Sequence, residues 1–107
     1  RLDLARLEAL LRRRICEALM LSGVTIVDPA STIIDSQVRI GQDTVIAPQT
    51  HILGHSTIGQ NCRLGPQVVI QDSTLGDEVC VEPFCVIRGT TVPAHRTLPA
   101  FSHLTSS

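Results

Sequence analysis

Aliphatic residues recur every six positions through most of this chain, and this period restricts the possible folds more than any other feature. Neither a helix of 3.6 residues per turn nor a simple strand alternation of two produces a period of six. A short strand and a tight turn, repeated three times per coil, do produce it, with each aliphatic side chain pointing inward. The sequence therefore predicts a mainly β protein, a parallel β-helix or hexapeptide-repeat prism of about four coils. Two steps, from Ile70 to Leu75 and from Ile87 to Val92, have five residues instead of six. The repeating residues are Ile34, Ile40, Ile46, Ile52, Ile58, Leu64, Ile70, Leu75, Val81, Ile87, Val92, Leu98 and Leu104.

The positions around each aliphatic residue follow the same repeat. We expect the glycines that come directly after it to let the chain turn without a clash. We also expect identical positions to stack into core ladders, with Ile52 over Ile70 as one example, each side chain contributing about 1.5–3 kcal/mol before entropy is subtracted. The glycines are Gly41, Gly59, Gly65 and Gly76, and the compact residues four positions after an aliphatic are Val38, Thr44, Thr50, Ser56, Cys62, Val68, Val79 and Cys85.

The first 22 residues have the pattern of an amphipathic helix instead. An apolar stripe recurs at three- and four-residue steps, and Gly23 stands where a left-handed C-terminal residue is wanted. We expect this helix to cover the first coil, and we interpret Arg12, Arg13 and Arg14 as a solvated helix face rather than an anion site. The predicted organisation is a helix at 1–23, a β-helix at 24–104 and a tail at 105–107. The residues of the stripe are Leu4, Leu7, Leu11, Ile15, Ala18 and Leu19.

Composition excludes several classes of function. All nine basic residues are arginine, so no lysine is available for a phosphate-binding loop or a Schiff base. A formal net charge of −1 argues against a nucleic-acid surface. No apolar run approaches the roughly 18–20 residues of a membrane span. The four cysteines form no CxxC pair, which favours free thiols and a cytoplasmic location.

Histidines and cysteines are the candidate reactive residues. His51 and His55 have a zinc-like spacing, but we expect them to lie around a strand-turn corner, where that spacing does not bring them together. His95 and His103 fall in the last coil, and His103 is the one candidate for a general base. Cys80 and Cys85 straddle one corner, and we expect Cys62 and Cys85 to act as small buried apolar residues. Residue pattern alone thus predicts no catalytic, cofactor-binding or metal-binding residue.

Ice binding through a flat face of the prism is a further possible function, because ice-binding β-helices present stacked Thr-x-Thr rows. The rows that we compared with such a face are Thr44, Cys62, Val79 and Thr50, Val68, Cys85, and they do not match it. Few apolar residues are expected on the outside of the coils, Leu53 and Val69 among them.

The segment from Gly23 to Pro29 resembles a known family when it is taken with the helix before it and the repeats after it. The segment reads Gly-Val-Thr-Ile-Val-Asp-Pro. Together with Ile46-Ala-Pro-Gln-Thr-His51, Leu64-Gly-Pro66 and Leu75-Gly-Asp77, it is similar to bacterial bifunctional enzymes that are both N-acetylglucosamine-1-phosphate uridyltransferases and glucosamine-1-phosphate N-acetyltransferases. This resemblance covers essentially the whole chain. It implies a left-handed coil, a homotrimer, and a helix that connects a nucleotidyltransferase domain to an acetyltransferase prism.

The same resemblance implies that the chain lacks both active sites. The family's uridyltransferase domain, with its magnesium ligands, would lie upstream of Arg1, and its acetyltransferase histidine would lie beyond residue 107. Thr105 stands where the family has a sugar-phosphate arginine. Magnesium, UTP, sugar phosphate and acetyl-CoA are thus expected only in a full-length parent, and no cofactor in this chain. The alternatives are a stand-alone β-helix that binds proteins, and a minimal acyltransferase whose site forms between subunits.

Overall fold

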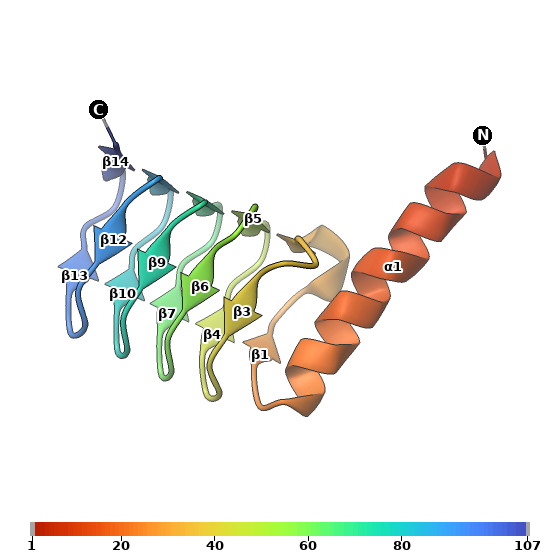
Figure 1. Ribbon diagram of the computed structural model, residues 1–107, viewed down its shortest axis with the longest axis horizontal. Coiled ribbons are helices and arrows are strands. Elements are labelled where there is room, and N and C mark those ends of the chain that lie inside the picture. The colour runs from red at the N-terminus through yellow and green to blue at the C-terminus, as the bar shows by residue number, and fades with distance from the viewer. Residues whose placement is uncertain (1, 107) are drawn as a thin grey trace.

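A computed structural model describes residues 2–106, in which three parallel sheets form the faces of a prism (Figure 1). Each coil adds one short strand to each sheet, and the helix α1 (Leu2–Leu21) lies at the N-terminal end. A short 3-10 turn follows at Pro29–Ser31. The first sheet contains β1 (Thr25–Ile26), β4 (Val45–Ile46), β7 (Arg63–Leu64), β10 (Cys80–Val81) and β13 (Thr97–Leu98). The second contains β2 (Ile33–Ile34), β5 (His51–Leu53), β8 (Val69–Gln71), β11 (Val86–Arg88) and β14 (His103–Thr105). The third contains β3 (Arg39–Ile40), β6 (Thr57–Ile58), β9 (Thr74–Leu75) and β12 (Thr91–Val92).

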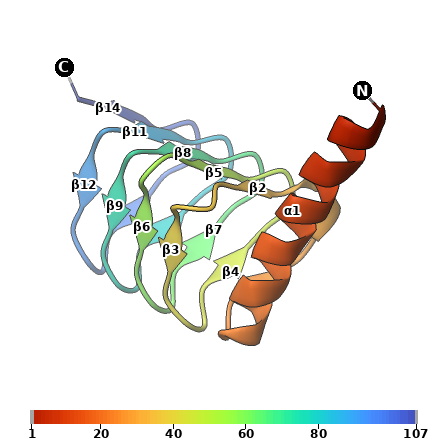
Figure 2. The ribbon, with the colours of Figure 1, turned by 45° about the vertical axis from the view of Figure 1, so that its right-hand side comes forward.

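The strand register confirms the predicted parallel β-helix and its core ladders, and the fold is consistent with the left-handed coil. Ile52 pairs with Ile70, and Ile46 pairs with Leu64. Their side chains fill the narrow space between the sheets that Figure 2 shows in oblique view. The prism has about five turns rather than four, because β1 pairs with β4 and the first coil begins at Thr25, before the first residue of the regular repeat.

The glycines after the core aliphatics are required by contact between coils. None of Gly41, Gly59, Gly65 and Gly76 has a positive φ. A Cβ built on Gly59 would lie 2.7 Å from the carbonyl carbon of Gly76, and one on Gly41 would lie 2.7 Å from that of Gly59. The coils therefore touch backbone to backbone at this corner.

Non-glycine residues occupy the left-handed region at the corners of the coils. For a residue with a Cβ, this conformation costs roughly 1–2 kcal/mol, because the Cβ comes too close to the following carbonyl oxygen. The backbone N–H of each such residue donates a hydrogen bond to the preceding coil, as Glu78 does to the Gln60 carbonyl at 2.8 Å. Two of them, Phe84 and Phe101, stack their rings with the ring centroids 5.2 Å apart. The residues concerned are Asp43, Gln49, Asn61, Gln67, Asp72, Glu78, Phe84, His95 and Phe101.

Buried hydroxyl and thiol groups join successive coils. Thr44 Oγ1 donates to the Gly59 carbonyl at 2.7 Å and accepts from the Cys62 N–H at 3.1 Å. The Cys62 thiol donates to the Gly76 carbonyl at 3.2 Å, so a cysteine takes the same role one coil later. The compact positions of the repeat therefore supply hydrogen bonds as well as small volume.

Replacing Thr44 by valine is expected to lower the free energy of unfolding by about 2 kcal/mol. The isosteric side chain leaves the buried Cys62 N–H and the Gly59 carbonyl without this partner. Thr44→Ser keeps the hydroxyl and is expected to lose less than about 1 kcal/mol. Urea unfolding followed by far-ultraviolet circular dichroism measures both. A loss for Thr44→Val no larger than that for Thr44→Ser would contradict the assignment of the effect to these hydrogen bonds.

The predicted helix end at Gly23 is confirmed. Gly23 has a φ of 102°, and its N–H donates to the Met20 carbonyl at 3.1 Å. The Val24 N–H donates to the Leu19 carbonyl at 3.1 Å, and the side chains of Val24 and Leu19 pack in the core. These two bonds and the apolar contact form a Schellman motif, which fixes the angle at which α1 meets the first coil.

The prediction that the whole helix covers the first coil is wrong for its N-terminal half. Cys16 is buried and Ile15 and Leu19 pack on the core, whereas the N-terminal turns extend past the prism (Figure 1). Leu4 and Leu7 keep 59% and 50% of their surface exposed. A 20-residue helix is about 30 Å long, so a helix anchored through its last turns overhangs the coil that it caps.

Two further expectations concern boundaries and membranes. Strand β14 runs to Thr105, so the last strand includes one residue of the segment expected to be a tail. Among residues 2–106 there is no helix with the length and apolar character needed to cross a membrane.

Candidate functional site

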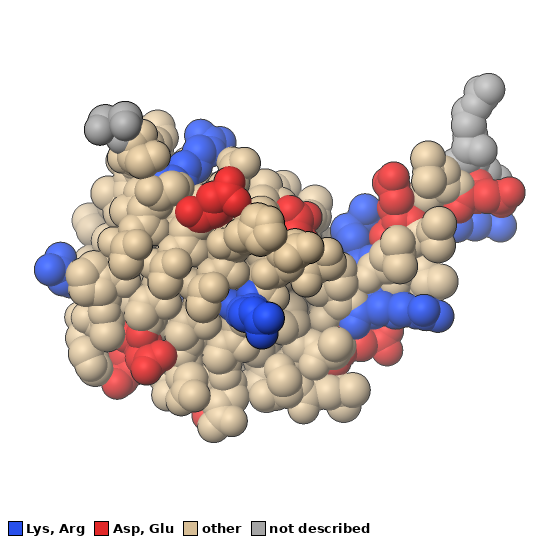
Figure 3. Space-filling model, viewed as in Figure 1, with Lys and Arg blue, Asp and Glu red and all other residues tan. Residues whose placement is uncertain are grey.

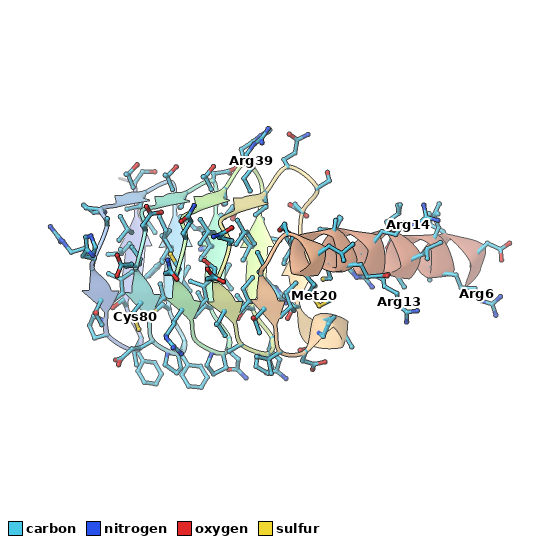
Figure 4. The ribbon with its side chains drawn as sticks, turned by 90° about the horizontal axis from the view of Figure 1, so that it is seen from below. Arg6, Arg13, Arg14, Met20, Arg39 and Cys80 are labelled. Carbon is cyan, nitrogen blue, oxygen red and sulfur yellow. The ribbon has the colours of Figure 1, made fainter. Side chains whose placement is uncertain are left out.

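His51 and His55 lie on different surfaces of one corner. His51 is half-buried on the outer side of β5, in register with Val69. His55 is exposed, and its backbone N–H donates to Asp72 Oδ1 at 3.0 Å. It lines a polar cleft of about 490 Å³ with Arg39, whose side chain projects from the prism in Figure 4. Throughout residues 2–106, no three His, Cys, Asp or Glu side chains come together in a way that suits a metal ion.

The two histidines of the last coils lie on different elements, His95 between β12 and β13 and His103 on β14. His95 lies at a corner, where its Nδ1 is 3.6 Å from Glu78 Oε2, with both side chains more than half exposed. A contact this exposed contributes at most about 1 kcal/mol. His103 is exposed on β14, in register with Val86.

The cysteines have the character of structural thiols. All four are free, and Cys16, Cys62 and Cys85 are buried. Burial raises the pKa of the Cys16 thiol and, as the largest of several influences, that of the Cys62 thiol. The Cys85 thiol donates to the Pro99 carbonyl at 3.1 Å. These thiols lack the electropositive, accessible setting of a reactive cysteine. Cys80 is the half-exposed one, on the outer side of β10 (Figure 4).

The two rows that do not match an ice-binding face are buried and form no outer surface. They are Thr44, Cys62, Val79 and Thr50, Val68, Cys85. Thr44, Cys62 and Val79 are 0% exposed, because they precede outward-facing strand residues and therefore point inward. The outward row of the third sheet consists of Arg39 and a ladder of three threonines, Thr57, Thr74 and Thr91. Each strand of this sheet has one outward residue, so a Thr-x-Thr pair is still absent from it.

A groove lies beside the helix. It has a volume of about 570 Å³ and separates α1 from β2. Leu11, Ile15 and Ala18 line it from the helix, and Ile33 and Ile34 line it from the first coil. Glu8, Arg12 and Arg14 stand at its edges. Its signal in the sequence is the apolar stripe, which predicts packing of the helix on the first coil.

The fold and its repeats define the class of this protein. Residues 37–72 match the family described as bacterial transferase hexapeptide (six repeats). This match lies within the coils that carry β3 to β8, where the strands and their inward aliphatics follow the six-residue period. This segment thus carries the repeat of the bacterial hexapeptide transferases.

More particularly, the chain is homologous to the C-terminal part of the bifunctional protein GlmU. It is 45% identical to GlmU of Synechococcus elongatus over 104 residues, which are 97% of this chain and 23% of that protein. It is 49% identical to GlmU of Syntrophomonas wolfei over 90 residues, 84% of this chain and 20% of that one. It is 54% identical to GlmU of Fervidobacterium nodosum over 81 residues, which are 76% of this chain and 18% of that protein. The chain spans less than a quarter of the length of these relatives.

Proposed function

We propose that this chain is the structural and assembly part of a bifunctional enzyme that synthesises UDP-N-acetylglucosamine, and that it lacks both active sites. Its similarity to GlmU over 97% of its length is the observation that carries the proposal. The separated histidines and the buried thiols also support it, because acetyl transfer needs a base beside the reacting amine. Thr105, exposed at the end of β14, offers no positive charge for a sugar phosphate.

The proposal includes the parent's ligands, assembly and location. A full-length parent would use magnesium and UTP in its uridyltransferase domain, and acetyl-CoA in its later coils. We propose that the chain forms a homotrimer, as the family resemblance suggests, since equivalent prism faces can pack around a three-fold axis. Its free cysteines support a cytoplasmic location.

An activity assay of the purified chain tests this function. We expect no thiol release from acetyl-CoA with glucosamine-1-phosphate, and no pyrophosphate release from UTP with N-acetylglucosamine-1-phosphate and magnesium, above blanks that contain the chain alone. The chain-only blank is needed because Cys80 is a free, half-exposed thiol and is expected to react with thiol reagents. Full-length GlmU of Synechococcus elongatus serves as the active control. Turnover that requires both substrates and is lost in a His95→Ala/His103→Ala variant would overturn the proposal.

A further inference from the structure

We draw no further inference here: the strongest candidate, the apolar groove that Leu11, Ile15 and Ile33 line between α1 and β2, carries no proposal, because nothing among the described residues shows what covers it and the acidic and basic side chains interspersed along α1 in Figure 3 favour no single partner.

Discussion

Replacing Ile52 by alanine is expected to lower the free energy of unfolding by about 4 kcal/mol. Ile52 is 0% exposed and lies in the middle of a core ladder, between Ile34 and Ile70. The coils above and below are tied by backbone hydrogen bonds and cannot collapse into the space that the lost atoms leave, so the cavity cost adds to the transfer cost. The free energy of unfolding of a small domain is roughly 5–15 kcal/mol, so this loss removes a large share of the total stability.

Urea unfolding followed by far-ultraviolet circular dichroism measures the change, because the chain has neither tryptophan nor tyrosine for fluorescence. Val69→Ala is the matched control. Val69 pairs with His51 on the outer side of the same sheet and is half-buried, so its loss is expected to stay near 1 kcal/mol. Equal losses in the two variants would contradict the assignment of the core to the inward ladder.

Gly59→Ala is expected to destabilise the fold by about 3 kcal/mol, although it adds only one methyl group. The new Cβ would lie 2.7 Å from the Gly76 carbonyl carbon and 2.7 Å from the Asp77 nitrogen. Both are backbone atoms of the next coil, so relief requires the coils to separate, which strains the strand pairing between β6 and β9.

The thermal midpoint of the Gly59→Ala variant provides the measurement, with an expected fall of roughly 12–20 °C for a domain of this size. Thr57→Ala changes an exposed residue of the same strand and is the control, with an expected effect within about 0.5 kcal/mol. A Gly59→Ala variant as stable as this control would show that coil-to-coil contact does not require glycine here.

The prism was predictable because its repeat reports directly on which side chains point inward. Ile40, Ile58 and Leu75 carry the period in the sequence, and their strands pair in the register that the period implies. Gly23 was predictable for a local reason, because a left-handed helix end favours glycine. The predicted β-helix includes the residues of β1, but the number of coils was one too low, since β1 belongs to the entry segment, where the six-residue period has not yet begun.

Other features depend on neighbouring coils and leave no local signal. Glu78, Phe84 and Phe101 adopt a conformation that their residue types disfavour, and a hydrogen bond to the preceding coil supports each of them. The apolar stripe of α1 predicted burial, but the sequence does not show that the Schellman motif directs Leu4 and Leu7 past the prism. No catalytic or binding residue was predicted, and the groove beside β2 arises from the placement of the helix.

Strand partners in this fold are always separated by a single coil, and this constancy has a consequence for folding. Ile34 pairs with Ile52, Ile52 with Ile70, and Ile70 with Ile87. The entropy lost on closing a loop depends on its length, so each new coil closes a loop of nearly the same size as the one before. Growth of the prism therefore meets the same entropic barrier at every step, and a longer array of coils need not fold more slowly per coil than a short one.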